Sequence, residues 1–265
     1  MSEETYEVYA VKYAHLMRRS PENFLGGDPH DVEMPLNYYV WVIRNAQRAV
    51  VVDTGFSEEM AKKRNRRIIR PVGEGVSALG LPPEKVTDVV ITHMHYDHAG
   101  NLPLFGNARF HLQDKEMEYV TGRCMCHDLM RHPYELEDVV HMVHCVYAQR
   151  VQFHDGAGQV APGIEVHHIG GHTKGIQAVR VWTKRGWLVL ASDTTHFYAN
   201  MEQERPFPIV YDVAQMLAGY ARLRKLASSA AHIVPGHDPL VLARYPAPSR
   251  ELEGIAARLD VEPRT

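Results

Sequence analysis

Residues 93–98 read His93-Met94-His95-Tyr96-Asp97-His98 and place four potential metal ligands within six positions. The stretch follows an apolar segment, residues 86–92, that is typical of a buried strand. Two imidazoles at positions i and i+2 of an extended backbone point to the same side, and a following turn can direct the next two ligands to a second point nearby. Packing alone does not explain such a density of ligands, so the stretch predicts two adjacent metal sites.

Three further loops each present one potential ligand after an apolar segment. They are Gly170-Gly171-His172-Thr173, Ala191-Ser192-Asp193 and Val234-Pro235-Gly236-His237-Asp238. Their small residues allow the backbone to approach a buried ion closely. Each ligand alone could be an ordinary loop residue, but with residues 93–98 they form the His and Asp set that zinc favours. A carboxylate can bridge two ions where an imidazole normally cannot, so Asp193 is the expected bridge.

The ordered set resembles the metallo-β-lactamase superfamily, whose pattern is H-x-H-x-D-H followed by a distant His, an Asp and a final His. The resemblance runs from about Asp53 to His237. It implies an αββα sandwich with two metal ions, expected to be Zn²⁺, at one edge of the sheets. It also implies one metal on His93, His95 and His172, a second on Asp97, His98 and His237, and Asp193 between them. Asp53 matches a position that orients a ligand imidazole without touching the metal.

Two zinc ions sharing a water lower its pKa from about 15.7 toward neutrality, which supplies a hydroxide for hydrolysis. Esters, thioesters, lactones, lactams and phosphodiesters are all compatible with this chemistry. The early segment Pro35-Leu36-Asn37-Tyr38-Tyr39 and the final Pro235-Gly236-His237-Asp238 resemble the branch of acyl-homoserine lactone lactonases. That resemblance implies opening of a lactone ring by a metal-bridging hydroxide, and quorum quenching as its role. The alternatives are a thioester hydrolase resembling glyoxalase II and an iron-dependent oxidoreductase of the same superfamily.

One position departs from the lactonase pattern. That branch usually has a Tyr three residues after the bridging Asp, whereas this chain reads Asp193-Thr194-Thr195-His196. His196 can donate a hydrogen bond or a proton near neutral pH, so it is a candidate catalytic group beside Asp97 and Asp193. Tyr198 is a second candidate for the missing phenol, and a supporting or surface histidine is the alternative for His196. The departure leaves the identity of the lactone open.

The rest of the chain predicts alternating strands and helices and a single domain over residues 1–265. Strands are expected over 37–43, 49–52, 86–92, 108–112, 164–169, 176–182, 187–191 and 232–234. Helices are expected over 58–70, 71–79 and 211–226, the last with Val213, Met216, Leu217, Tyr220 and Leu223 on its apolar face. The pattern of residues from 113 to about 147 predicts an inserted helical region, which is a lid, plain core or an oligomer contact.

Composition excludes several classes of partner. The net charge is only −3, and the one cationic run is expected to be a solvated helix face rather than a nucleic-acid site; it comprises Lys62, Lys63, Arg64, Arg66, Arg67 and Arg70. The N-terminus lacks a signal-peptide pattern and no segment is apolar enough to span a membrane, which favours a cytoplasmic protein. Three cysteines suit a reducing compartment. Symmetric dimers are common, so a homodimer is expected by frequency alone.

Overall fold

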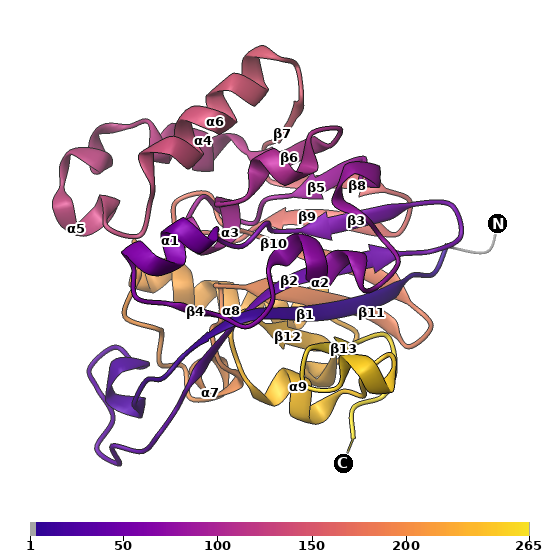
Figure 1. Cartoon of the computed structure of the whole chain (residues 1–265). Helices are drawn as coiled ribbons and strands as arrows, with labels where there is room; N and C mark the ends of the chain where they lie inside the picture. Colours follow the sequence, from indigo (N-terminus) through magenta and orange to yellow (C-terminus); the bar gives the residue numbers. More distant parts are fainter. Residues whose placement is uncertain (1–3, 265) are drawn as a thin grey trace.

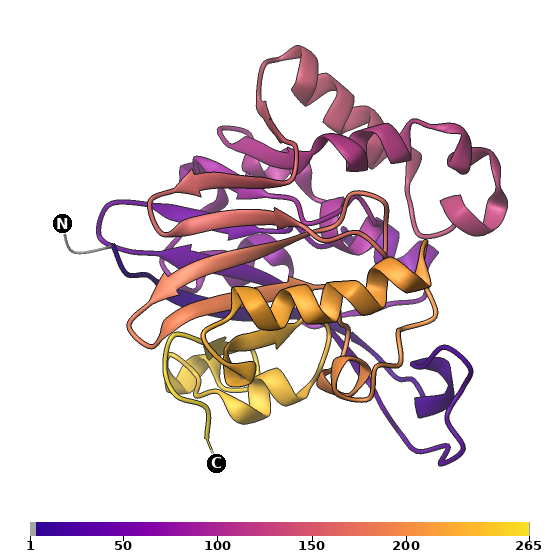
Figure 2. The same ribbon diagram turned by 180° about the vertical axis from the view of Figure 1, so that it is seen from behind.

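Two β-sheets pack face to face and carry helices on both outer surfaces (Figures 1 and 2). The computed structural model describes residues 4–264. This arrangement confirms the αββα sandwich and the single α/β domain that the sequence predicts. No helix within residues 4–264 has the length and apolar character needed to cross a membrane.

The larger sheet has eight strands in the order β13-β1-β2-β3-β5-β6-β7, with β4 paired to β1. Their bounds are β1 Glu7–Leu16, β2 Leu36–Arg44, β3 Ala49–Val52, β4 Arg67–Ile68, β5 Asp88–Val90, β6 Arg109–Gln113, β7 Val151–His154 and β13 Ala256–Arg258. The expected hairpin is present, because β2 and β3 pair antiparallel from Trp41–Val52 to Arg44–Ala49. Strands β3, β5, β6 and β7 are mutually parallel, so β3, β5 and β6 deliver their following loops to one edge.

The smaller sheet has five strands in the order β12-β11-β10-β9-β8. Their bounds are β8 Ala157–Ala161, β9 Ile164–His168, β10 Gln177–Thr183, β11 Gly186–Ser192 and β12 Ile233–Pro235. The α-helices are α1 Glu58–Lys63, α2 Val72–Ser77, α3 Tyr96–Ala99, α4 Asp114–Val120, α5 Asp128–Arg131, α6 Leu136–Tyr147, α7 Tyr198–Glu202, α8 Val213–Leu226 and α9 Leu240–Arg244. Short 3₁₀ helices span Ser20–Glu22, Pro83–Lys85, Leu102–Phe105, Arg123–Cys126, Ala230–His232 and Arg250–Leu252.

The alternation of side chains along β2 explains how the central layers form. Tyr39, Trp41 and Ile43 are buried between the two sheets. Val40 and Val42 point the opposite way and pack under the helices of the outer layer. Because successive side chains of a strand face opposite sides, a strand covered on both faces reads as a continuous apolar run. This is why residues 38–43, which follow the polar Asn37, form an unbroken run of aromatic and aliphatic side chains.

Two sequence expectations need correction. The helix expected over 58–70 ends at Lys63, because Asn65 adopts a positive φ of 51° and Arg67–Ile68 pair with β1 as strand β4. On α8, Met216, Tyr220 and Leu223 are buried against the smaller sheet as expected. Val213 and Leu217, expected on the same face, remain 40% and 39% exposed. The buried stripe is therefore narrower than the sequence suggests.

The helical region expected over 113–147 is present as α4, α5 and α6. It projects from the same edge of the sheets as the excursion between β1 and β2, as both views show (Figures 1 and 2). Tyr119, Tyr134 and Met142 belong to the core under the larger sheet, with Met125 and Met130 packed against it. The region is thus partly plain core, and its action as a lid stays a prediction.

The first turn of α6 contains a carboxyl group that titrates near neutrality. Burial raises the pKa of Asp138 to about 7; Glu135 adds to this shift and Arg64 opposes it. Because the folded-state pKa lies above the ordinary value of 3.8 for an aspartic acid, the folded protein loses stability as pH rises through the window between the two values. The full difference in pKa would correspond to about 4 kcal/mol, and solvent screening of this partly exposed carboxyl reduces it. We therefore expect Asp138→Asn to match the wild type at pH 4 and to be more stable at pH 8 by about 1 kcal/mol or more, with a Tm higher by at least about 2 °C. Thermal unfolding at both pH values checks this, and an equal difference at both would contradict the assignment.

Candidate metal centre

The structure brings all seven predicted ligands to one edge of the sandwich. His93 and His95 follow β5, and Asp97 and His98 lie in α3. The remaining three follow strands of the smaller sheet: His172 lies between β9 and β10, Asp193 follows β11, and His237 follows β12. Ligand atoms of His93, His95, His172 and Asp193 lie within 4.8 Å of one another, and so do those of Asp97, His98 and His237. The loops of both sheets therefore converge on two adjoining clusters.

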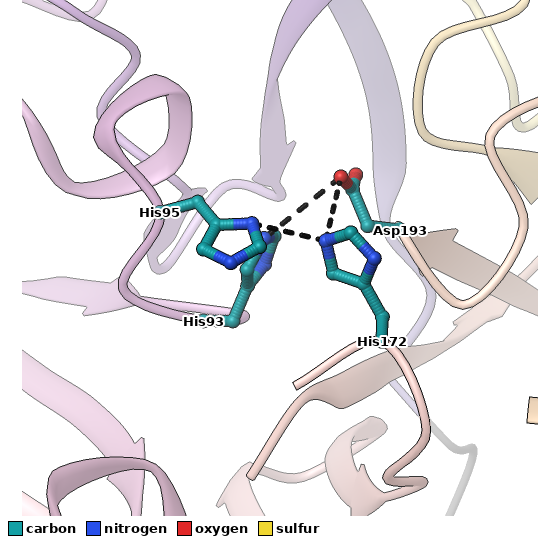
Figure 3. Close-up of side chains that lie close together, drawn as sticks. All are labelled: His93, His95, His172 and Asp193. Carbon is teal, nitrogen blue, oxygen red and sulfur yellow. Dashed lines mark hydrogen bonds and ion pairs between the residues drawn. The ribbon is translucent and has the colours of Figure 1, made fainter. Parts of the chain in front are cut away.

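Asp193 faces both clusters with different oxygens. Its Oδ2 lies 3.2 Å from His172 Nε2 and 3.8 Å from His93 Nε2 (Figure 3). Its Oδ1 lies 3.2 Å from His98 Nε2 and 2.9 Å from His237 Nε2. On the first side, His95 Nδ1 lies 3.0 Å from His172 Nε2. One carboxylate thus separates the two imidazole groups and can serve both.

Contacts outside the clusters fix the ring orientations. Asp53 Oδ2 lies 2.7 Å from His98 Nδ1, which confirms the supporting position expected for this aspartate. Asp53 is itself held by Thr92, whose backbone N–H and hydroxyl donate over 2.7 and 2.8 Å. The other Nδ1 contacts are His93 with Thr92 Oγ1, His172 with the Ile209 carbonyl and His237 with the Asn37 carbonyl. These contacts leave the Nε2 atoms of four histidines directed inward.

The donor set fits divalent metal ions. Burial lowers the pKa of His93 and of His95 well below the usual range, so both imidazoles are neutral and offer lone pairs. Within residues 4–264, the buried Nε2 atoms of His93 and His98 have no hydrogen-bond partner. Unpartnered buried nitrogens are costly, and a cation would satisfy them. Imidazole and carboxylate together suit zinc and other first-row divalent ions.

Comparison with known families agrees with this geometry. The family model described as the metallo-beta-lactamase superfamily matches residues 34–237, which contain every residue of both clusters. The chain belongs to the metallo-β-lactamase superfamily.

Individual relatives and solved structures share the fold. An N-acyl homoserine lactonase of Bacillus cereus is 25% identical over 222 residues, covering 77% of this chain and 82% of that relative. A crystal structure of a quorum-quenching N-acyl homoserine lactone lactonase has 22% identity and a TM-score of 0.73, covering 90% of this chain and 95% of the other. A probable metal-dependent hydrolase from Staphylococcus aureus has 16% identity and a TM-score of 0.74, covering 100% and 97%. At these identities the two structural likenesses establish the fold.

Glu116 is a site residue that sequence reasoning missed. It lies in α4, is fully buried, and receives the backbone N–H of Met94 at 2.9 Å on Oε1. Its Oε2 accepts the Thr173 hydroxyl at 2.6 Å and the Gly175 N–H at 3.0 Å. A Cβ on Gly175 would lie 2.1 Å from the Glu116 backbone nitrogen, so this loop needs glycine for its close approach. One carboxylate therefore ties together the metallo-β-lactamase ligand loops that carry His93, His95 and His172.

His196 lies at the centre, whereas Tyr198 does not. His196 Nε2 is 3.0 Å from Asp193 Oδ2, and its ring stacks on Phe207 with centroids 3.7 Å apart. It also forms a third possible ligand group with Asp193 and His237. Burial lowers the pKa of His196 to about 3, so the imidazole is neutral. Tyr198 packs between the sheets, with the Arg244 guanidinium 4.0 Å from its ring centroid, and does not line the pocket above the clusters.

Two neighbouring depressions meet at the centre of this metallo-β-lactamase site. The first, over the clusters, is lined by Tyr38, Tyr96 and Phe207 and by three arginines, Arg18, Arg64 and Arg66. The second, of about 160 Å³, is mostly apolar and shares His95 and His172; its walls include Tyr119, Leu129, Met130 and Ile209. Arg64 and Arg66 belong to the run expected to be a solvated helix face. That expectation is wrong for these two residues, because the chain leaves the helix at Arg64 and turns them toward the pocket.

Proposed function

We propose that the chain is a metal-dependent hydrolase that opens a lactone ring, with two divalent ions, Zn²⁺ being the expected one. The observation that carries the proposal is the position of Asp193, whose two oxygens face two separate imidazole groups. The N-acyl homoserine lactonases among the relatives support lactone as the substrate class, since one of them matches 77% of this chain. The proposed substrate is a small lactone or related ester.

The ligand assignment follows the two clusters. His93, His95 and His172 would hold one ion, Asp97, His98 and His237 the other, and Asp193 both. When bound, such a pair of ions activates water and polarises an ester carbonyl. Asp53 and backbone carbonyls orient the imidazole ligands. Tyr38 and Phe207 form an aromatic wall of the pocket, which limits the access of bulk water.

His196 is the proposed hydrogen-bond donor to the opening ring, because its imidazole is neutral and has no acidic proton to transfer. Its ring is held by Phe207 on one face, and its Nε2 faces Asp193 within the pocket. A neutral imidazole carries one N–H and can stabilise charge that develops on the carbonyl or leaving oxygen. Because Tyr198 lies outside the pocket, it is not the substitute for the phenol of the lactonase pattern.

Replacing His196 separates this role from metal binding. We expect His196→Ala to lower kcat for a good lactone by about 10²-fold, the lower end of what loss of one hydrogen-bond donor to a developing oxyanion costs, with metal content unchanged. His172→Ala is expected to lose metal as well as turnover, because His172 belongs to a ligand cluster. Tyr198→Phe is the control and should retain wild-type kcat. Metal analysis beside steady-state kinetics checks all three, and full activity in His196→Ala would reduce the residue to a packing role.

The substrate class is tested by matched esters. Metal-loaded protein is assayed with short and long lactones by a pH indicator, and with the corresponding thioesters by a thiol-detecting dye. The proposal predicts one base equivalent consumed per lactone and little thiol release. Thiol release without lactone opening would instead favour a thioesterase resembling glyoxalase II, and bound iron without hydrolysis of either would favour the oxidoreductase.

A further inference from the structure

The pocket over the two clusters has a cationic rim. Arg18, just beyond the end of β1, and Arg64 and Arg66, between α1 and β4, line it together with His95, His172, Asp193, His196 and His237. A groove of about 560 Å³ continues outward from Arg64 and Arg66, and its lining also includes the basic side chains of Lys63 and Arg131 and the carboxylates of Asp128 and Glu135. A substrate reaching the clusters along this groove therefore passes several positive charges.

The arginines differ in how their charge is balanced. Arg64 forms a two-pronged pair with Glu135, at 2.6 and 3.0 Å, and Lys63 Nζ lies 2.5 Å from the same carboxylate. Arg18 donates only to neutral oxygens, the Asn23 side chain at 2.7 Å and the Glu22 carbonyl at 2.6 Å. The Glu22 carboxylate instead accepts the Arg19 backbone N–H at 2.7 Å.

Arg66 likewise has neutral partners. It donates to the Tyr96 hydroxyl at 3.1 Å and to the Arg64 carbonyl at 2.7 Å. Among the residues that the structure describes, no carboxylate oxygen lies within the 4.0 Å ion-pair distance of either Arg18 or Arg66. Both arginines are partly buried. Burial lowers the pKa of Arg18. Burial acts in the same direction on Arg66, but the neighbouring Tyr38 and Tyr96 outweigh it and raise the pKa of that guanidinium. A partly desolvated cation without an anion is unfavourable unless something binds it.

Aromatic side chains hold both guanidinium groups beside the clusters. The Arg18 guanidinium lies 5.1 Å from the ring centroid of Phe207, which stacks on His196. The hydroxyl that binds Arg66 belongs to Tyr96 and lies 3.2 Å from the Tyr38 hydroxyl. The Tyr38 ring packs edge-on against His237, with centroids 5.4 Å apart. One or two aromatic side chains therefore connect each arginine to a histidine of the clusters. These contacts restrict the arginine side chains, so that little side-chain entropy is lost when a ligand binds.

We propose that the substrate carries an anionic oxygen group, a carboxylate or a phosphate, which Arg18 and Arg66 bind while its ester carbonyl lies at the clusters. This inference rests on the proposed lactone hydrolysis and names its substrate class. Guanidinium groups bind carboxylate and phosphate through charge-assisted hydrogen bonds, which are roughly twice as strong as neutral ones. An acyl-homoserine lactone has no such charge, so this chain prefers a different lactone from those named for its relatives.

The test compares two anionic lactones with a neutral lactone that matches the carboxylate in size. Metal-loaded full-length protein is assayed with γ-butyrolactone β-carboxylate (5-oxooxolane-3-carboxylate), its neutral β-carboxamide, and the phosphate monoester of β-(hydroxymethyl)-γ-butyrolactone. We expect at least one anionic lactone to exceed the carboxamide about tenfold or more in kcat/KM, and which one does so distinguishes carboxylate from phosphate. Arg66→Gln and Arg18→Gln should each lower kcat/KM for that anionic lactone about 10- to 100-fold, mainly through KM, the range that loss of a charge-assisted hydrogen bond gives. The carboxamide should change less than about threefold.

Arg67→Gln is the matched control. Arg67 is an exposed residue of β4, next in sequence to Arg66, and it lines neither the pocket nor the groove. The variant removes the same charge, so an equal loss there would assign the effect to the overall field of the protein and overturn the proposal. Unchanged Tm in the Arg66 and Arg18 variants shows that the fold is retained.

A binding measurement separates this inference from the proposed activity. Calorimetry with the ring-opened diacid 2-(hydroxymethyl)succinate and with its monoamide needs no turnover. If neutral lactones are opened but charge gives no advantage in rate or binding, the anion site is overturned and the lactonase stands. If no lactone is opened while diacid binding depends on Arg18 and Arg66, the anion site stands and the lactonase is overturned. If neither rate nor binding responds to these arginines, the anion site is likewise overturned.

Discussion

Asp193→Ala is expected to lose both metal ions together and to lower lactone turnover by about 10³-fold or more, equivalent to about 4 kcal/mol of activation free energy. The reason is the position of the carboxylate, with Oδ2 3.2 Å from His172 Nε2 and Oδ1 2.9 Å from His237 Nε2. The substitution removes one ligand from each imidazole group. It also removes the negative charge that would lie between the two metal ions and reduce their mutual repulsion. Elemental analysis of the purified variant beside lactone kinetics measures both effects.

His237→Ala is the informative comparison for this bridge. His237 groups with Asp97 and His98, away from His93 and His95. The His237→Ala substitution should therefore deplete the ion held by Asp97 and His98 more than the ion held by His93, His95 and His172. If Asp193→Ala also retained one ion at full occupancy, the carboxylate would serve a single site and the bridging assignment would be wrong.

Glu116→Gln is expected to weaken metal binding about 10- to 100-fold although Glu116 is not in either cluster. Burial raises the pKa of Glu116, while hydrogen bonds from Thr173, Met94 and Gly175 oppose the shift. A glutamine has one acceptor oxygen and turns an NH₂ group toward backbone N–H donors, which costs about 1–3 kcal/mol for each donor left unpaired. The loops carrying His95 and His172 would then lose their common anchor. Competition with a chelator measures the affinity, and thermal unfolding measures the stability.

Glu118→Gln is the control for this prediction. Glu118 lies in the same helix, and its substitution removes the same formal charge. The Glu118 side chain, however, is 65% exposed, and its one ion-pair contact is with Lys174 at 3.8 Å. Surface ion pairs of this kind contribute little, so metal affinity and Tm should stay near wild type. Equal losses in both variants would attribute the effect of Glu116 to charge rather than to the loop anchor.

The sequence predicted the clusters because the ligands follow a local rule. The seven candidate ligands lie in four loops that follow apolar strands, and the strand ends of this sandwich converge at one edge. Their division between two metal ions was implied by the resemblance to the superfamily. Glu116 could not be predicted in this way. Its partners Met94, Thr173 and Gly175 lie far from it in sequence, and a Glu inside a short charged helix reads as a solvent-exposed residue. The glycine at 175 was the available signal, since it marks a close backbone approach.

The arginine rim was misread for a related reason. A run of Lys and Arg at helical spacing is typical of a solvated face. The helix stops at Lys63, however, and the left-handed turn at Asn65 places Arg64 and Arg66 on the wall of the pocket. Local propensity did not show this, because the pairing of Arg67–Ile68 with β1 is a tertiary effect.

The most direct test of the central claim is lactone hydrolysis during metal reconstitution. Protein stripped with a chelator is titrated with Zn²⁺, and bound metal and ring opening are measured on the same samples. We expect no ring opening by the stripped protein and an activity that rises to a plateau as two equivalents of Zn²⁺ bind per chain. Ring opening by the metal-free protein, or two bound ions with no hydrolysis of any lactone in a neutral and anionic panel, would contradict the central claim.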